Sequence, residues 1–184
     1  MKKYNSVTEE FLNEVRAVVG DANVFTEAEK LEQYKTDEEY DPRRFRVPEA
    51  VVRPADTEEI AAVVKLCNKY NVPLTVRGGG TSLADGAIAV CGGIVLLMER
   101  LNKIIEMNTE AMYLIAEAGV RTVDIQKMAN EAGYLYAGDP CSAESCLIGG
   151  NLATNAGGSK AVRYGVTRNQ VYSCLLYTSD AADE

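Results

Sequence analysis

Three consecutive glycines flanked by hydrogen-bond donors form the stretch of this sequence best suited to hold an anion. The stretch runs from Val76 to Ser82, reads V-R-G-G-G-T-S and follows an apolar run. Glycines let the backbone adopt left-handed conformations and approach a ligand closely. Consecutive N–H groups in such a turn favour negative charge, and Arg77 and Thr81 supply further donors. We therefore predict a cradle for a pyrophosphate; the alternative is a glycine-rich hairpin turn.

Neither of the two standard phosphate-loop motifs fits this stretch. No lysine follows the glycines, as the mononucleotide P-loop requires. The pattern G-x-G-x-x-G needs glycine where Leu83 or Asp85 stands. The prediction of an anion site therefore depends on the run of glycines and its donors alone.

A second stretch, from Asp139 to Gly158 and on to Gly165, is crowded with small residues and amides. The residues that keep bulk away from a bound group are Gly149, Gly150, Ala153, Ala156, Gly157 and Gly158. The residues that can supply oriented hydrogen bonds are Asn151, Thr154 and Asn155. Such a surface fits a flat ring system with polar edges. The alternative is close packing of backbone segments through glycine.

The composition excludes several classes of protein. With 184 residues and 47% hydrophobic content, the chain can bury the core of one domain or two small lobes. Its net charge of −8 disfavours nucleic acid and anionic membranes as partners. The chain has no histidine, and its five cysteines form no C-x-x-C pair, which weakens zinc sites, histidine dyads and a disulfide framework. Without an apolar run long enough for a membrane or a signal peptide, we expect a cytoplasmic protein.

The N-terminal segment, residues 1–46, is predicted to be helical. Thr8 caps a helix with apolar residues at helical spacing, and Gly20 closes it. A short helix follows at about residues 27–34. The charged stretch 37–48 is predicted to be a solvated connector. The alternative is that one of its arginines reaches a ligand phosphate; these are Arg43, Arg44 and Arg46.

A β-α-β unit follows. Residues 50–53 form a short strand, Thr57 opens a helix that Asn71 stops, and residues 74–77 form a second strand. This order predicts parallel strands covered by the helix. The glycine loop then lies at the carboxyl end of a strand, where ligands bind in open α/β sheets.

The strand and helix order is looser after the glycine loop. Residues 94–98 are a candidate for a buried strand, and 103–107 and 112–117 are further strand candidates. Thr122 is predicted to cap a helix that Gly133 ends. This order suggests a second lobe, in which antiparallel pairing is one arrangement.

Residues 174–184 read C-L-L-Y-T-S-D-A-A-D-E and resemble one reading frame of a transposase sequencing adapter. We expect this tail to be non-native and the natural frame to continue differently after Ser173. A genuine short acidic tail is the alternative. The domain division predicted from the sequence is a helical segment at 1–46, a ligand-binding domain at 47–173 that is incomplete at its C-terminal end, and the tail.

The two glycine stretches together resemble the FAD-linked oxidase family. V-R-G-G-G-T-S is followed by I-G-G-N-x-A-x-N-A-G-G and then by R-Y-G, and the lead-in from Arg53 to Ile60 is also similar. The resemblance is to the vanillyl-alcohol-oxidase or PCMH type of FAD-binding domain, within it to the glycolate oxidase flavin subunit and D-lactate dehydrogenase group. It implies an α+β fold with two lobes: a small parallel β-α-β sheet in the first, and a mixed or antiparallel sheet with helices, here truncated, in the second.

The resemblance also implies which residues contact FAD. The pyrophosphate is expected at Gly78, Gly79, Gly80, Thr81 and Ser82, with Arg77 beside them. The residues expected beside the flavin and its ribityl chain are Pro140, Ser142, Gly149, Gly150, Asn151, Asn155, Gly157, Gly158, Tyr164 and Gly165. Some relatives attach flavin through a histidine where this chain has Leu83 and Ala84, so non-covalent FAD is expected. Cys146 is expected to be an inert buried thiol.

The function implied is oxidation of a 2-hydroxy acid, glycolate- or D-lactate-type, with two-electron reduction of FAD. Implied electron acceptors are an electron-transfer flavoprotein, a quinone or an iron–sulfur subunit. The substrate domain is expected beyond this chain, so no catalytic residue is named and the fragment alone is expected to be inactive. Two alternatives stay open: a non-catalytic FAD- or nucleotide-binding module, and an unrelated α/β structural domain.

Overall fold

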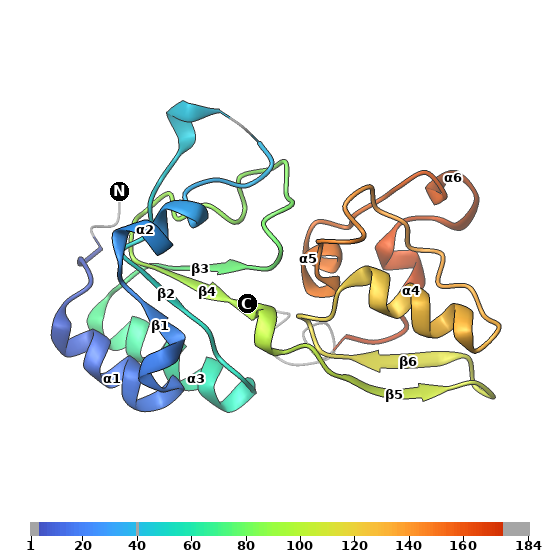
Figure 1. Cartoon of the computed structure of the whole chain (residues 1–184), viewed down its shortest axis with the longest axis horizontal. Coiled ribbons are helices and arrows are strands. Elements are labelled where there is room, and N and C mark those ends of the chain that lie inside the picture. The colour runs from blue at the N-terminus through green and yellow to red at the C-terminus, as the bar shows by residue number, and fades with distance from the viewer. Residues whose placement is uncertain (1–3, 40, 175–184) are drawn as a thin grey trace.

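The computed structural model describes residues 4–39 and 41–174, and they form two lobes that lie side by side (Figure 1). The first lobe runs to Leu101 and contains a four-stranded sheet, while the second begins at Ile104 and contains a two-stranded sheet. The predicted two-lobed α+β architecture is confirmed. Residues 175–184, most of the tail predicted to be non-native, lie outside the described residues.

The first sheet has the strand order β1-β2-β4-β3. Its strands are β1 (Val24–Phe25), β2 (Ala50–Val52), β3 (Leu74–Arg77) and β4 (Ile94–Leu97). β2 and β3 are parallel, as predicted, but they do not touch each other, because β4 lies between them and pairs with both. The antiparallel edge strand β1 was not predicted, since two residues are too few to show a pattern. β2 and β4 are wholly buried, which explains their uninterrupted apolar sequences.

Two helices, α1 (Glu9–Val19) and α3 (Thr57–Tyr70), pack together in the core formed on one face of this sheet. The Thr8 hydroxyl accepts a hydrogen bond from the backbone N–H of Phe11, and Asn71 ends α3 in the left-handed conformation. Phe11 is fully buried with Ile94 in the same core. The N-terminal helical segment therefore shares the hydrophobic core of the first lobe.

The other face of the sheet is covered by α2 (Ala28–Leu31), the 3-10 turn Glu32–Tyr34 and the loop around Ala89. Leu31 and Ala89 pack there against Val51 and Val95. This second core is small, but it fixes the loop that leads from the glycine stretch back into β4.

The second lobe combines an antiparallel hairpin with three helices. They are β5 (Ile104–Asn108), β6 (Tyr113–Ala116), α4 (Thr122–Glu131), α5 (Ile148–Ala153) and α6 (Ala161–Tyr164). The prediction that Thr122 caps α4 was wrong, since Arg121 occupies the cap position and Thr122 is the first helical residue. The Thr122 hydroxyl lies 3.3 Å from the Cys146 sulfur, because an isolated bridge between Arg121 and Leu147 brings that segment alongside.

Additional 3-10 turns lie at Asp21–Asn23, Pro42–Arg44, Met98–Arg100 and Thr167–Gln170. Across the part of the chain that the structure describes, each helix is too short or too polar to cross a bilayer.

Candidate functional site

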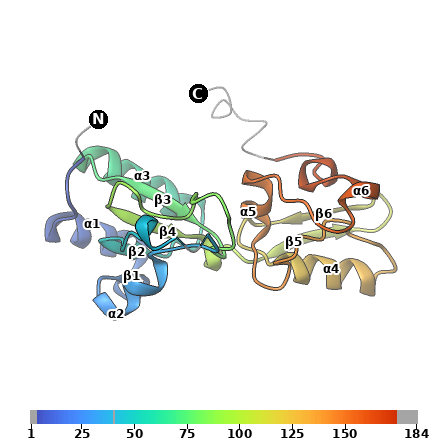
Figure 2. The ribbon, with the colours of Figure 1, turned by 90° about the horizontal axis from the view of Figure 1, so that it is seen from above.

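The glycine loop after β3 meets the segment that leads into α5, at the junction of the two lobes (Figure 2). A methyl group on Gly79 would lie 2.2 Å from the carbonyl oxygen of Ser145, and one on Gly78 would contact the Leu147 side chain at 3.5 Å. Glycine at position 79 is therefore required for the lobes to approach. The two stretches singled out in the sequence lie far apart along the chain, at 76–82 and 139–165, yet they are in contact.

The glycine loop presents a row of backbone donors. Within residues 4–39 and 41–174, no protein acceptor receives the backbone N–H groups of Gly78, Gly79, Gly80, Thr81 and Ser82. Gly80 has φ +70°, a left-handed conformation that favours glycine. Backbone N–H groups without a protein acceptor can donate hydrogen bonds to a bound anion. This row therefore provides the donor set that an anion such as a pyrophosphate requires.

Arg77 is placed beneath this loop and is only 8% exposed. Its Nη1 donates hydrogen bonds to the carbonyl oxygens of Thr36 at 2.7 Å and Ala87 at 3.3 Å. Its guanidinium lies over the Tyr34 ring, 5.6 Å from the centroid. Burial lowers the pKa of the Arg77 guanidinium. In this structure Arg77 therefore joins three segments of the first lobe, and its contact with FAD stays a prediction.

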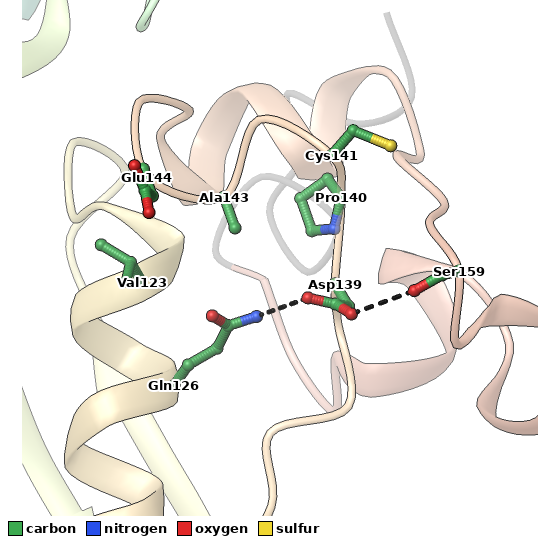
Figure 3. A pocket seen from close by; sticks show the side chains of 8 residues that line it. All are labelled: Val123, Gln126, Asp139, Pro140, Cys141, Ala143, Glu144 and Ser159. Carbon is green, nitrogen blue, oxygen red and sulfur yellow. Dashed lines mark hydrogen bonds between the residues drawn. The ribbon is translucent and has the colours of Figure 1, made fainter.

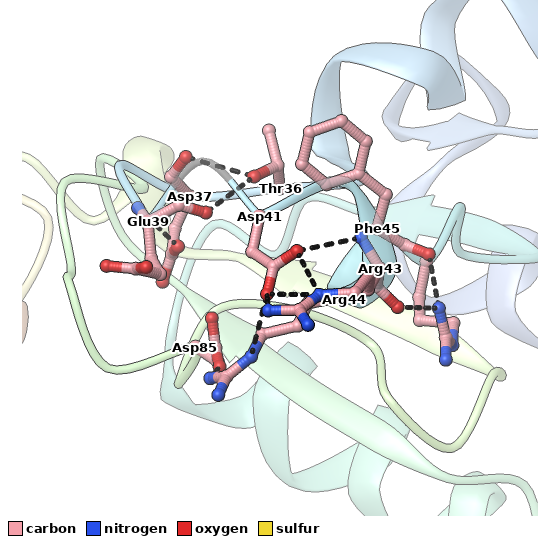
Figure 4. A network of polar contacts seen from close by, with 9 residues as sticks. Thr36, Asp37, Glu39, Asp41, Arg43, Arg44, Phe45 and Asp85 are labelled. Carbon is pink, nitrogen blue, oxygen red and sulfur yellow. Dashed lines mark hydrogen bonds and ion pairs between the residues drawn. The ribbon is translucent and has the colours of Figure 1, made fainter.

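The charged connector is fastened to the glycine loop, which the sequence did not predict. The backbone N–H of Glu38 donates to the Ser82 carbonyl at 3.1 Å, and Arg44 forms an ion pair with Asp85. Asp37 is buried, with 7% of its surface exposed. Most of the connector is nevertheless exposed, as expected of a solvated segment, and it is attached to the first lobe at these points (Figure 4).

The three connector arginines have partners within the protein. Arg43 and Arg44 pair with the carboxylates of Asp41 and Asp85, and Arg46 donates to the carbonyl oxygens of Arg43 and Phe45. Figure 4 shows this network of contacts around Asp41. The structure therefore gives no support to the alternative that one of these arginines reaches a ligand phosphate.

The glycines of the second stretch fall into two groups. Gly149 and Gly158 are packing residues, because a methyl group would lie 2.8 Å from Ala118 Cβ in the first case and 1.7 Å from the Asp139 carbonyl oxygen in the second. Gly150 differs, since a methyl group there would meet no atom within 4 Å. Gly157 has only ordinary contacts with Val166 and Ala161. Close packing and open surface thus coexist in one stretch.

The two asparagines that were predicted to contact FAD form hydrogen bonds that hold the second stretch in shape. Asn151 is 4% exposed and its amide nitrogen donates to the Thr122 hydroxyl. Asn155 has φ +50° and its Oδ1 accepts the backbone N–H of Arg168 at 3.0 Å. Tyr164 is partly exposed, and the guanidinium of Arg163 lies over its ring. Gly165, with φ +81°, ends α6.

A cavity of about 360 Å³ adjoins the predicted residue Pro140 (Figure 3). Its lining residues are Val123, Gln126, Asp139, Pro140, Cys141, Ala143, Glu144 and Ser159. Asp139 accepts hydrogen bonds from Gln126 and Ser159 and pairs with Lys160 at 3.2 Å. Lys160, and then Ser159 and Gln126, lower the pKa of the Asp139 carboxyl. With two carboxylates in its wall, this cavity is unsuited to a phosphate. Ser142 lies beside it, and its carbonyl accepts the Cys146 N–H at 2.8 Å.

Comparison with known proteins decides the family. Residues 48–181 match the family model described as FAD binding domain. The chain belongs to this FAD binding domain family. It is 37% identical to D-lactate dehydrogenase of Anaerostipes hadrus, covering 92% of this chain and 35% of that protein. It is 36% identical to D-2-hydroxyglutarate dehydrogenase of Stutzerimonas stutzeri, and the match covers 91% of this chain and 36% of that protein.

A third relative is the glycolate oxidase subunit GlcD of Bacillus subtilis, which is 37% identical over 71% of this chain and 28% of its own length. This chain thus spans about a third of the length of these curated relatives. The resemblance to FAD-linked oxidases, and FAD as the cofactor, are confirmed.

Solved structures show the same fold. Alkyldihydroxyacetonephosphate synthase superposes with a TM-score of 0.77 at 23% identity, covering 89% of this chain and 35% of that one. p-Cresol methylhydroxylase with substrate bound superposes with a TM-score of 0.68 at 24% identity, and the match covers 82% of this chain and 30% of that one. The PCMH-type fold predicted for the FAD domain is therefore confirmed.

The residues present fit FAD. The loop from Gly78 to Ser82 offers free backbone donors for a diphosphate, and Gly150 leaves open space in the facing stretch. Sequence reasoning missed the residues that hold these parts in place, namely Thr36, Glu38, Ala118 and Ser145. They act through backbone atoms, so their side-chain types carry no signal.

Proposed function

We propose that this chain is the FAD-holding part of a flavin-dependent dehydrogenase or oxidase that acts on the CH–OH group of a 2-hydroxy acid. The observation that carries the proposal is the meeting of the glycine loop with the segment before α5, at Gly79 and Ser145. The names of the relatives, which include dehydrogenases of D-lactate and D-2-hydroxyglutarate, support the substrate class.

In this proposal the backbone N–H groups of Gly78 to Ser82 bind the FAD pyrophosphate, and Arg77 holds the loop from below. The remaining predicted residues line the flavin and ribityl portion, with Gly150 giving the closest approach. FAD supplies the two-electron acceptor, while the protein binds it, orients it and excludes water. The residues that bind the hydroxy acid and take its proton belong to the rest of the protein.

We further propose that FAD is bound without a covalent bond. Leu83 and Ala84 offer no nucleophile beside the glycine loop. The Cys146 thiol is 2% exposed and contacts the Thr122 hydroxyl, as expected of a structural cysteine. Acid precipitation of the flavin-loaded protein should leave the flavin in the supernatant; yellow colour in the pellet would contradict this part of the proposal.

The proposal also covers the setting of the enzyme. We place it in the cytoplasm, with electrons passing to an electron-transfer flavoprotein, a quinone or an iron–sulfur subunit. We keep the FAD domain at 47–173 and the tail from Cys174 as non-native, although the family match continues to residue 181. Resequencing the source locus across the Ser173 codon tests this, since a genuine tail would give the same frame through Glu184.

The binding site is tested by Gly150→Ala. A methyl group at Gly150 touches no protein atom, so it fills only space that the proposal assigns to FAD. We expect FAD affinity to fall about tenfold or more, while the unfolding free energy of the flavin-free protein rises by roughly 0.5–1 kcal/mol because alanine favours a helix interior. Titration of FAD followed by flavin fluorescence, with urea unfolding of the flavin-free protein, measures both effects.

Gly86→Ala is the matched control. A methyl group at Gly86 also meets no atom within 4 Å, but Gly86 is not among the predicted FAD contacts. We expect Gly86→Ala to bind FAD as the original chain does. Equal affinity of FAD for Gly150→Ala and Gly86→Ala would show that FAD does not approach α5.

A further inference from the structure

Three consecutive residues, at the point where the charged connector begins, hold both ends of the glycine loop. Arg77, immediately before the loop, donates a hydrogen bond to the carbonyl oxygen of Thr36 at 2.7 Å. Ser82, at the end of the loop, accepts the backbone N–H of Glu38 at 3.1 Å through its carbonyl oxygen. Asp37 lies between these two attachment points in the sequence. This short segment therefore constrains the spacing between the two ends of the loop.

The Asp37 side chain sets the shape of this segment. Its Oδ1 accepts the backbone N–H of Glu39 at 3.0 Å, which forms a turn held by the carboxylate (Figure 4). The Thr36 hydroxyl donates to the Asp37 carbonyl oxygen at 3.1 Å within the same turn. Because such a turn fixes the directions of the backbone groups, the Thr36 carbonyl and the Glu38 N–H are presented to the loop together.

Asp37 is the one buried carboxylate among the described residues. Within that part of the chain, its Oδ2 accepts no hydrogen bond. Burying a carboxylate costs free energy unless a charge or hydrogen bonds compensate. Burial lowers the pKa of the Arg77 guanidinium, and the nearby Asp37 carboxylate counteracts that effect. The charge of Asp37 thus balances the buried charge of Arg77, while its Oδ1 shapes the turn.

The Arg77 guanidinium also supports the middle of the loop. A methyl group on Gly80 would lie 2.2 Å from Arg77 Nη2, so the guanidinium lies directly against the glycine backbone. The loop is therefore held at its start, its middle and its end. Its backbone N–H groups have no acceptor within the described residues. Donors that are fixed in place before a ligand arrives lose less conformational freedom on binding, which increases affinity.

We propose that Asp37 is a positioning residue for the FAD pyrophosphate. By accepting the Glu39 N–H, it holds the turn that fastens the glycine loop at Arg77 and Ser82, and so presets the spacing of the donors in the loop. Asp37 acts through the loop and does not touch the cofactor. This inference rests on the proposed function, because it requires that the glycine loop binds the pyrophosphate.

Two substitutions separate the turn from the charge. Asp37→Ala removes the acceptor for the Glu39 N–H, whereas Asp37→Asn keeps an acceptor at Oδ1 and removes only the charge. Three ligands separate the pyrophosphate from the flavin. FAD contains both, ADP contains the pyrophosphate without the flavin, and riboflavin contains the flavin without the pyrophosphate. Fluorescence titration measures the affinity of the two flavins, and calorimetry measures that of ADP.

We expect Asp37→Ala to bind FAD and ADP about tenfold more weakly and to bind riboflavin as the original chain does. Asp37→Asn should bind all three ligands within about twofold of the original chain. It should nevertheless unfold at a lower urea concentration, because Arg77 loses its opposite charge. A residue that only stabilised the fold would weaken the binding of ADP and riboflavin alike.

Asp41→Ala is the matched control. Asp41 Oδ1 accepts the backbone N–H of Arg43 at 3.1 Å, which is the same kind of turn at another point of the connector. Its hydrogen bonds and ion pairs join it to Arg43 and Arg44 rather than to the glycine loop. We expect Asp41→Ala to bind the three ligands as the original chain does. Thermal melting curves set a titration temperature at which each variant is folded.

The attachment at Ser82 is tested without changing the buried carboxylate. Glu38→Pro removes the N–H that the Ser82 carbonyl accepts, whereas Glu38→Ala keeps it. Glu38 is exposed, so neither substitution removes a packed side chain. We expect Glu38→Pro to weaken the binding of FAD and ADP about tenfold and Glu38→Ala to leave it unchanged.

Three results would overturn this inference and leave the proposed function intact. Unchanged FAD affinity in Asp37→Ala and Glu38→Pro would show that the turn does not position the loop. Equal losses for ADP and riboflavin would show that Asp37 only stabilises the fold. Equal losses of FAD affinity in Asp37→Ala and Asp37→Asn would show that the charge acts rather than the turn. If the original chain bound riboflavin as tightly as FAD, the proposed role of the glycine loop would fail, and this inference with it.

Discussion

At the scale of single residues, the chain uses polar side chains mainly to join segments distant in sequence. The buried Arg77 holds the carbonyls of Thr36 and Ala87, and the buried Asn151 holds the hydroxyl of Thr122. Asp139 likewise accepts hydrogen bonds from Gln126 and Ser159 and forms an ion pair with Lys160. The residues with the most polar contacts are therefore responsible for shaping the site, whereas backbone donors are expected to contact the cofactor.

Arg77→Met tests this role of Arg77. Methionine keeps much of the apolar stem but leaves the carbonyls of Thr36 and Ala87 without their buried donor. We expect the free energy of unfolding to fall by about 3 kcal/mol, since each unsatisfied buried group costs roughly 1–3 kcal/mol. Urea denaturation measures the change. Arg163→Met, at an exposed position, is the control and should stay within about 0.5 kcal/mol of the original chain; a similar loss in both variants would contradict the special role of Arg77.

Asp139 makes a pH-dependent contribution to stability. Because Lys160 and the other donors lower its folded pKa, the ionised carboxylate stabilises the fold at pH values above its unfolded pKa of about 3.9. This contribution is lost as the pH falls through the lower, folded pKa. We expect Asp139→Asn to destabilise the chain at pH 7 by less than about 1 kcal/mol, since the pair is partly exposed and screened by solvent. The difference between the two chains should shrink towards pH 3. Urea denaturation at both pH values measures it, and a constant difference would show that the charge of Asp139 is not involved.

At the scale of elements, the site depends on contacts between loops rather than on the regular elements themselves. The glycine loop contacts both the connector before β2 and the segment before α5 through backbone atoms. The sheet and helices fix where these loops begin and end. A change that leaves every helix and strand intact can therefore still disrupt the site.

Gly79→Ala is such a change. A methyl group 2.2 Å from the carbonyl oxygen of Ser145 cannot be accommodated unless the loop or the facing segment moves. We expect a loss of roughly 1–3 kcal/mol, the usual cost of overpacking, together with weaker FAD binding. Gly86→Ala again serves as the neutral control. Unfolding followed by amide hydrogen exchange should show faster exchange in both facing segments; unchanged exchange there would mean that the lobes do not meet at Gly79.

The accuracy of sequence-based prediction also varied with the kind of element. α1 and α3 were predicted with their ends, because caps such as Thr8 and Asn71 accompany a clear helical period. The insertion of β4 between β2 and β3 was not predicted, since apolar runs do not reveal which strand is central. In the candidate site, the sequence singled out two glycine-rich stretches that the structure brings into contact, but only the structure separates the packing glycine Gly149 from the open Gly150.

At the scale of the whole molecule, FAD is expected to couple the two lobes. The loop that we propose to bind the pyrophosphate belongs to the first lobe, the stretch that we propose to line the flavin belongs to the second, and the two meet at one junction. A ligand that contacts both lobes stabilises their association as well as each lobe. FAD should therefore act as part of the structure and not only as a redox group.

A thermal melt tests this coupling. At a concentration about 100 times its dissociation constant, FAD should stabilise the folded chain by about 2.7 kcal/mol and bring the unfolding of both lobes into one transition. Riboflavin, which lacks the pyrophosphate, is the matched ligand and should give a smaller shift. Calorimetry with each ligand measures the result, and equal shifts would contradict binding of the pyrophosphate by the glycine loop.

The central position of β4 has a consequence for synthesis on the ribosome. β2 and β3 are made before β4, and although β2 already has β1 as a neighbour, both strands lack their shared central partner until Ile94 to Leu97 have emerged. Until then the growing chain holds two apolar strands with open edges, a state that favours association with other chains. A chaperone that binds nascent chains would therefore be needed most while residues 77 to 97 are being added.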